Sequence, residues 1–254
     1  MILNYQIHLN KTLTEKTPLV FIHGLFGSLS NLGILARHFS EQRTVIQLDV
    51  RNHGHSGHSA DLNYQLMAED VLETLSSLNI QKFVVVGHSM GGKIAMKLAD
   101  LAREQTEKLI VLDITPIQYH ESHHTEIFKA LFAVQQANVT SRLEAAKIMR
   151  EYIYEEMVIQ FLLKSFNKGQ WLFNVQALFD HYPDIMDWEK VEQINQPALF
   201  LRGGNSFYIS KPEHFEAIND QFSQAKIKVI ENTGHWLHGE KPDEVIKHMQ
   251  TFLN

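Results

Sequence analysis

Short hydrophobic runs, each ending at a glycine or a polar turn, recur along the chain. Continuous apolar runs of this length are typical of strands buried on both faces of a parallel sheet. Residues 1–9 alternate between apolar and polar instead, as an antiparallel edge strand would. The predicted buried strands are residues 19–23, 44–49, 82–87, 109–113, 198–202 and 226–230.

Helical periodicity occupies the gaps between these strands, as in residues 63–78, 91–101 and 242–253. Strands that alternate with helices predict an α/β fold, with a mostly parallel twisted sheet and helices on both of its faces. The alternation stops at residue 117, and only helical patterns follow up to residue 190: 125–136, 140–154, 158–166 and 170–179. We therefore expect a core of residues 1–116 and 191–254, with a helical cap of residues 117–190 inserted into it.

Composition narrows the possible functions. The chain has 254 residues, 44% of them hydrophobic, which suits one domain with a full-sized core. A net charge of -6 argues against nucleic acid as a partner, because phosphate binding needs clustered Lys and Arg. The absence of cysteine excludes disulfides, thiolate nucleophiles and Cys-ligated zinc. With no secretion signal and no apolar run of about 18 residues, we expect a cytoplasmic protein without a membrane span.

The clearest chemical motif is G-x-S-x-G, which runs from Gly87 to Gly91 with Ser89 at its centre. It joins a predicted buried strand to a predicted helix, which is typical of the nucleophile turn of the α/β-hydrolase fold. A serine at so sharp a turn is strained and needs neighbours without bulk, and both of the glycines meet that need. We predict that Ser89 is a nucleophile; the alternative is a structural turn with an idle serine.

A nucleophilic serine needs a base, and in this fold the chain order is serine, acid, histidine. His235 lies in the loop after the last predicted strand and is the expected base. His238 is the rival, but it lies closer to the following helix and further from the strand end.

The acid is less standard. In most proteins of this fold it follows the strand predicted at 198–202, but the loop 203–207 contains no carboxylate. Asp113 ends the strand after the nucleophile helix, and neighbouring strand ends lie on the same side of the sheet. We therefore predict that Asp113 orients the histidine. Asp184 or Asp187 from the predicted cap is the alternative.

An H-G-x-x-G loop, residues 23–27, follows an early predicted strand. Acyl-transfer enzymes of this fold stabilise the oxyanion with two backbone N–H groups. One donor is the residue after the nucleophile, here Met90, and the second comes from the loop. We predict Leu25 as the second donor, with Phe26 as the alternative.

A histidine-rich loop, with His53, His55 and His58 in the pattern H-x-H-x-x-H, follows the strand predicted at 44–49. It resembles a dinuclear zinc hydrolase motif, but glycine replaces the aspartate of that motif, and nothing else in the chain completes such a site. We interpret it as a tight glycine-rich loop. We expect neither a metal nor an organic cofactor.

Taken together, these segments resemble the bacterial YbfF esterases; they are residues 23–28, 49–56, 87–93, 111–116, 201–206 and 234–236. The resemblance covers nearly the whole chain and is least specific in the predicted cap. In that family the acid follows the strand after the nucleophile helix, which supports Asp113. The resemblance implies a serine esterase or thioesterase that cleaves small acyl esters and acyl-CoA thioesters through an acyl-enzyme on Ser89.

Three other functions are compatible with the same residues. A lyase similar to the menaquinone-pathway synthase MenH uses the triad for proton abstraction, but its acid follows the later strand, where this chain has Ser206. A cofactor-free perhydrolase or haloperoxidase shares the motif, and a non-enzymatic receptor of the plant hormone type can retain a triad. The sequence leaves open the acyl chain length, the leaving group, the physiological substrate and the oligomeric state.

Overall fold

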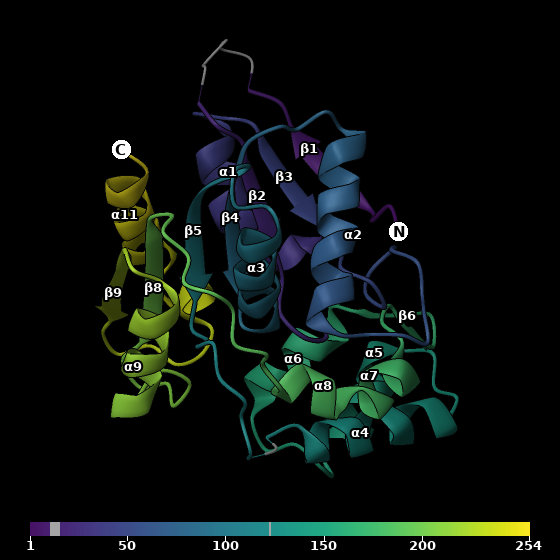
Figure 1. Cartoon of the computed structure of the whole chain (residues 1–254). Coiled ribbons are helices and arrows are strands. Elements are labelled where there is room, and N and C mark those ends of the chain that lie inside the picture. Colours follow the sequence, from purple (N-terminus) through teal and green to yellow (C-terminus); the bar gives the residue numbers. More distant parts are fainter. Residues whose placement is uncertain (11–15, 122) are drawn as a thin grey trace.

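The computed structural model describes residues 1–10, 16–121 and 123–254. A seven-stranded sheet forms its centre, in the order β1-β3-β2-β4-β5-β8-β9 (Figure 1). Neighbouring strands run parallel, except that β1 is antiparallel to β3. The strands are β1 (Tyr5–His8), β2 (Leu19–Ile22), β3 (Val45–Leu48), β4 (Phe83–His88), β5 (Thr106–Leu112), β8 (Ala198–Gly203) and β9 (Ala225–Ile230). The predicted α/β fold, with its antiparallel first strand, is confirmed.

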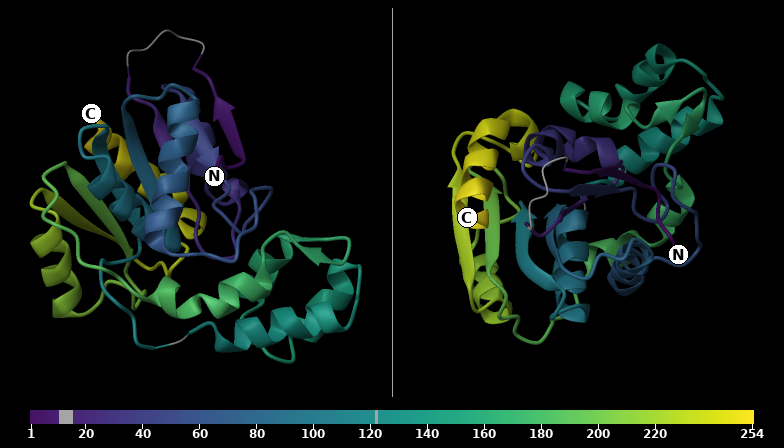
Figure 2. Two further views of the ribbon diagram at one scale, coloured as in Figure 1. Left: turned by 45° about the vertical axis from the view of Figure 1, so that its right-hand side comes forward. Right: turned by 90° about the horizontal axis from the view of Figure 1, so that it is seen from above.

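Helices cover both faces of the sheet, with α1 and α11 on one face and α2 and α3 on the other (Figure 2). Successive strand residues point to opposite faces, so Phe21 packs in the cluster with α1 and α11, and Ile22 in the cluster with α2 and α3. The helices of this part are η1 (Leu29–Leu32), α1 (Gly33–Ser40), α2 (Tyr64–Ser77), α3 (Met90–Leu101), α9 (Pro212–Gln221), α10 (Leu237–Glu240) and α11 (Pro242–Leu253). No helix in the described residues is long and apolar enough to cross a membrane.

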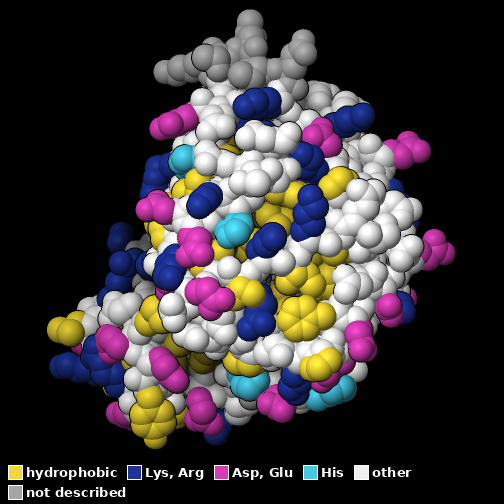
Figure 3. Space-filling view, turned by 90° about the vertical axis from the view of Figure 1, so that its left-hand side faces the viewer, with side chains coloured by type: hydrophobic (Ala, Val, Ile, Leu, Met, Phe, Trp, Pro, Cys, Tyr) yellow, Lys and Arg dark blue, Asp and Glu magenta, His cyan; other side chains and the backbone are white. Residues whose placement is uncertain are grey.

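Strand β9 differs from the prediction. It lies at the edge of the sheet rather than buried on both faces, and its Lys226 and Lys228 side chains are exposed. The face of the molecule on this side mixes Lys and Arg with hydrophobic side chains (Figure 3). Charged residues on an edge strand oppose pairing with a second chain, which explains why lysines interrupt an otherwise apolar strand.

The helical segment, residues 117–190, connects β5 to β8 and lies below the carboxyl ends of the parallel strands in Figure 1. The prediction of helices alone is wrong at residues 166–171, where two short strands pair as a hairpin. Lys168 and Gly169 join them with φ of 47° and 85°, the backbone that a two-residue hairpin turn requires. The elements are α4 (Thr125–Gln136), α5 (Arg142–Met149), α6 (Glu156–Leu163), β6 (Phe166–Asn167), β7 (Gln170–Trp171), α7 (Val175–Asp180) and α8 (Tyr182–Met186).

Candidate active site

Strand β4 passes into α3 through Ser89, whose φ of 53° and ψ of -123° lie outside the regions that side chains prefer. The turn has no room for side chains on either side. A Cβ on Gly87 would lie 2.0 Å from the Gly91 oxygen, and one on Gly91 would lie 2.3 Å from the Ile22 oxygen. Both glycines are therefore required for the serine to stand at this turn.

The ends of three central strands are joined around Asp113, which follows β5. The Ser89 N–H donates to the Leu112 oxygen at 3.0 Å, and the Asp113 N–H donates to the Leu201 oxygen at 2.8 Å. The Asp113 side chain is fully buried, and its Oδ1 accepts the Gly203 N–H at 2.9 Å. Asp113 has a φ of 55°, so its backbone, like that of the serine, is strained at the site.

His235 contacts Asp113 as the sequence predicts, with 2.8 Å between Nδ1 and Oδ2. Because a carboxylate oxygen only accepts, Nδ1 donates, and Nε2 stays available to take a proton. The Ser206 hydroxyl donates to the same Oδ2. The His235 ring lies 4.1 Å from the Tyr208 ring and 4.7 Å from the His88 ring, measured between centroids. These contacts fix the orientation of an imidazole whose side chain is 20% exposed.

Ser89 and His235 are not joined by a hydrogen bond in the described part of the chain. Catalytic hydrogen bonds are often long in a free enzyme and shorten when substrate binds. His88, the residue before Ser89, connects the two segments instead: its Nε2–H donates to the His235 carbonyl at 2.9 Å. Met90 begins α3 directly after the serine, so its N–H has no partner within the helix.

The alternatives for base and acid lie elsewhere. His238 is buried in α10 beside His88, and burial lowers its pKa to about 3. Asp184 pairs with His181 at 2.7 Å near the surface, and the Asp187 carboxylate accepts the N–H of the next residue. None of these three residues contacts the Asp113 carboxylate. The structure therefore brings none of the alternative bases or acids together with Asp113.

The H-G-x-x-G loop lies against the serine, because a Cβ on Gly24 would be 3.3 Å from the Ser89 Cβ. The Phe26 N–H donates to His53 Nε2 at 3.1 Å. The Leu25 N–H has no partner among the described residues. Of the two amides that the sequence offers as the second oxyanion donor, only that of Leu25 is left for a ligand.

The histidine-rich loop does not assemble a metal site in the described residues, where no group of three or more His, Asp or Glu is placed to hold an ion. His53 is buried, and both of its ring nitrogens are used: Nε2 by Phe26, and Nδ1 to donate to the Arg51 oxygen at 3.0 Å. Burial lowers the pKa of His53 to about 3, so the ring is neutral. His55 and His58 are exposed.

Sequence reasoning missed Ser206, Tyr208, His88 and His53 as parts of the site. For Ser206 the sequence does contain a signal: it lies in the loop 203–207, where most proteins of this fold have the catalytic carboxylate and this chain has none. The ring contacts of Tyr208 and His88 with His235 join residues far apart in the sequence, and no local pattern announces them.

Comparison with known proteins gives matches along the whole chain. A family model described as the alpha/beta hydrolase fold matches residues 17–137. Esterase YbfF of Escherichia coli is 46% identical over 254 residues, which cover 100% of both proteins. The sn-1-specific diacylglycerol lipase ABHD11 of Mus musculus is 36% identical over 247 residues, which cover 92% of this chain and 80% of the lipase. A solved structure of a marine microorganism esterase is similar with a TM-score of 0.92 and 32% identity, covering 99% of each chain.

Proposed function

Because this chain belongs to the α/β-hydrolase superfamily and, within it, to the YbfF esterase family, it is a carboxylic ester hydrolase, and we propose that it works through an acyl-enzyme on Ser89. Ser89 Oγ attacks the acyl carbonyl while His235 Nε2 takes its proton. Asp113 holds the tautomer of the imidazole and stabilises the imidazolium that forms.

The remaining steps use the same groups. The N–H groups of Leu25 and Met90 donate to the oxyanion of the tetrahedral intermediate. Protonated His235 gives its proton to the departing alcohol or thiol. Water then attacks the acyl-enzyme, with His235 again as the base, and the carboxylic acid leaves. No step requires a metal or an organic cofactor.

One observation carries the proposal: the 2.8 Å contact between His235 Nδ1 and the buried Asp113, at the strand end next to Ser89. The same contact weighs against the MenH-like lyase, whose acid follows the later strand. In this chain that loop contributes the Ser206 hydroxyl, which donates to Asp113 rather than replacing it.

We propose small acyl esters and acyl-CoA thioesters as substrates, the second on the resemblance of the sequence. The name of the mouse relative adds diacylglycerol as a candidate. We further propose that residues 117–190 form a cap that bounds the acyl site. In support, Phe161 of α6 lies 5.6 Å, between ring centroids, from Trp236, the residue after His235.

The test is the hydrolysis of p-nitrophenyl esters, acyl-CoA thioesters and a diacylglycerol, each over graded acyl lengths. We expect multiple turnovers on short esters, which a receptor would not give. Ser89→Ala should lower kcat by several orders of magnitude without unfolding the protein, because members of a triad act as a unit. A variant that keeps more than about a tenth of the wild-type kcat would overturn the acyl-enzyme proposal.

A further inference from the structure

Two loops, one of which lies against Ser89, are joined by hydrogen bonds between histidine rings and backbone amides. His23, in the loop after β2, accepts the N–H of Val50 at Nε2 over 3.2 Å. His53, in the loop after β3, accepts the N–H of Phe26 at Nε2 over 3.1 Å. The two rings contact each other edge to face, with 5.1 Å between centroids. Each loop therefore holds the other through a backbone amide. We call this pair of contacts the histidine clasp.

The protonation of the clasp follows from its partners. The Nδ1 of His23 lies 2.8 Å from the Gly24 oxygen, and the Nδ1 of His53 lies 3.0 Å from the Arg51 oxygen. Carbonyl oxygens accept and backbone amides donate, so each ring carries its hydrogen on Nδ1 and is neutral. Both side chains are buried, and burial lowers the pKa of each ring, which keeps it neutral.

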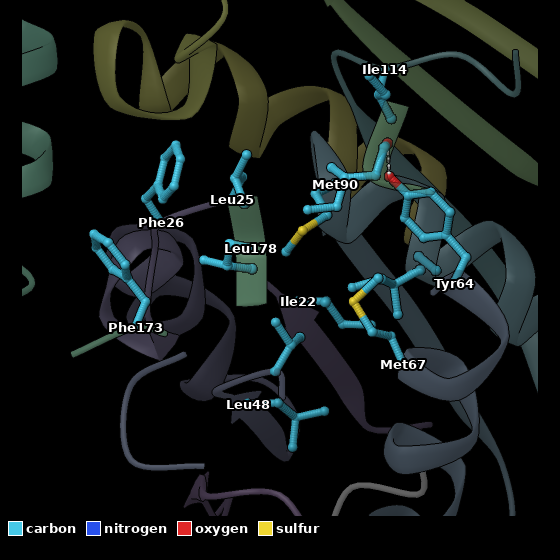
Figure 4. Packing of buried hydrophobic residues seen from close by; sticks show 14 of the residues in the cluster. Ile22, Leu25, Phe26, Leu48, Tyr64, Met67, Met90, Ile114, Phe173 and Leu178 are labelled. Carbon is cyan, nitrogen blue, oxygen red and sulfur yellow. Dashed lines mark hydrogen bonds between the residues drawn. The ribbon is translucent and has the colours of Figure 1, made fainter. Parts of the chain in front are cut away.

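Phe26 is also fixed on its other sides. Its φ is 61°, a conformation that a bulky residue adopts only when its surroundings impose it. Its carbonyl accepts the Ser165 hydroxyl at 3.2 Å. Its ring contacts those of Phe128 and Phe173 at 5.3 and 5.2 Å between centroids, and Figure 4 shows it beside the Phe173 ring. These three partners belong to the helical segment, which therefore contacts the H-G-x-x-G loop directly.

The helical segment is also attached to the clasp itself. His53 pairs with Phe173 as an isolated antiparallel bridge, and the Asn174 N–H donates to the Asn52 oxygen at 2.9 Å. The loop after β3 therefore contacts both the helical segment and the H-G-x-x-G loop. His53 is the residue that contacts both.

We propose that His53 is a positioning residue for the oxyanion hole: by accepting the Phe26 N–H, it holds the loop in the conformation that leaves the Leu25 N–H free beside Ser89. This inference rests on the proposed function, in which Leu25 is an oxyanion donor. The His53 side chain is fully buried, so it is not available to contact a substrate. Its effect on the reaction passes through the backbone of Phe26.

Three substitutions separate the acceptor at Nε2 from the rest of the ring. His53→Leu removes both polar atoms. His53→Asn keeps a donor near Nδ1 but does not reach Phe26, whereas His53→Gln brings an acceptor to the place of Nε2. Loss of one oxyanion donor lowers kcat about 10²- to 10³-fold, so a displaced donor should cost about 10- to 100-fold. We expect that loss for Leu and Asn, with KM changed less than about twofold, and recovery of most of the activity for Gln.

A second readout separates positioning from general structure. An alkylboronic acid forms a tetrahedral adduct with the serine, and its affinity should fall in parallel with kcat in His53→Leu and His53→Asn. His55→Leu, an exposed histidine of the same loop, is the matched control and should change neither quantity. If His53→Leu keeps wild-type kcat, or if Gln is no better than Asn, the proposal is wrong.

Should the variants fail to fold, the wild-type protein still decides the question. Nuclear magnetic resonance should detect a scalar coupling across the hydrogen bond between the Phe26 amide nitrogen and His53 Nε2. A His53 ring with its hydrogen on Nε2 would contradict the clasp. Ser89→Ala is measured in parallel: full activity in that variant would refute the acyl-enzyme and leave the coupling unaffected, so the two failures are distinguishable.

Discussion

Two buried carboxylates, Asp70 on α2 and Asp113 after β5, have opposite surroundings. The Asp70 oxygens lie 2.6 and 2.9 Å from Nε and Nη2 of Arg51, and the amino group of Met1 lies 2.6 Å from Oδ1. Asp113 accepts from an amide, from a hydroxyl and from His235. The charge of Asp70 is therefore compensated by cations at all times. The charge of Asp113 is compensated only when His235 is protonated.

This difference shows how two equally buried carboxylates take different roles. A buried charge needs hydrogen bonds, and both residues have them. Only the carboxylate with neutral partners gains when the neighbouring imidazole becomes cationic. That gain arises as Ser89 attacks in the proposed mechanism, so the surroundings of Asp113 favour the transition state, whereas those of Asp70 favour the folded state.

The largest expected effect is that of Asp113→Asn on the reaction. The amide preserves the shape but can stabilise the wrong tautomer of His235 and no longer balances its charge. We expect kcat to fall about 10⁴-fold, as for the same change in serine proteases. The measurement is steady-state kinetics on a short p-nitrophenyl ester. Asp184→Asn, whose partner His181 lies near the surface, is the control and should change kcat less than twofold. Equal losses in the two variants would remove Asp113 from the mechanism.

Asp70→Asn should act on stability instead. It leaves the guanidinium of Arg51 buried without its countercharge, which costs about 3–5 kcal/mol of the free energy of unfolding. Urea unfolding measures this loss, and kcat per folded molecule should change little. Asp100→Asn breaks the partly exposed pair with Arg103 and should cost about 1 kcal/mol or less. A large loss of kcat in folded Asp70→Asn would erase the contrast between the two carboxylates.

The sequence predicted most of the sheet and the positions of Ser89, Asp113 and His235, because each of these follows a strand whose apolar run is visible locally. Strands of a parallel sheet end at one edge, so residues that follow them come together without further information. The hairpin at β6 and β7 was missed because its strands are two residues each, too short for a period to show. Strand β9 lies at the predicted residues, but its exposure depends on its position at the end of the strand order, which no local pattern records.

The parts of the site that were missed share a cause. The sequence presents His53 only as a candidate metal ligand, because the spacing of the three histidines within one loop is visible locally. Its contact with the Phe26 amide joins two loops that follow different strands. Ser206 likewise acts on a carboxylate 93 positions earlier. Such roles depend on tertiary contacts between residues far apart in the sequence, which leave no spacing pattern within one segment.

Lys93 extends the comparison to a buried cation. Its ammonium donates to the carbonyl oxygens of Met186 and Asp187 at 3.1 and 2.9 Å, and burial lowers its pKa from 10.5 to about 7. The unfolded chain then binds more protons than the folded one between pH 7 and about 10, so the free energy of unfolding should rise with pH there. The slope that Lys93 contributes is at most about 1.4 kcal/mol per pH unit, and it falls to zero below pH 7, where the folded and unfolded states are both protonated.

Lys93→Met tests this sign. Urea unfolding at pH 6, 7.5 and 9 should show a flatter rise in the variant than in the wild type, because the titrating group is gone. Lys97→Met, four residues along α3 with an exposed partner at 3.6 Å, is the control and should keep the wild-type slope. If both variants show the wild-type slope, the pKa of Lys93 lies near its ordinary value, and burial does not lower it.

The smallest expected effect concerns one neutral partner of Asp113. Ser206→Ala removes the hydroxyl that donates to the oxygen shared with His235, but leaves the Gly203 amide and the imidazole in place. A net hydrogen bond to a charged group contributes about 1.5–3 kcal/mol, and water can replace part of it, so kcat should fall about tenfold or less. Steady-state kinetics on a short p-nitrophenyl ester measure this loss. Ser210→Ala, whose exposed hydroxyl donates to the Phe207 carbonyl, is the control and should leave kcat unchanged. A wild-type kcat in Ser206→Ala would mean that the Gly203 amide and the His235 imidazole are enough to hold the Asp113 carboxylate in its catalytic position.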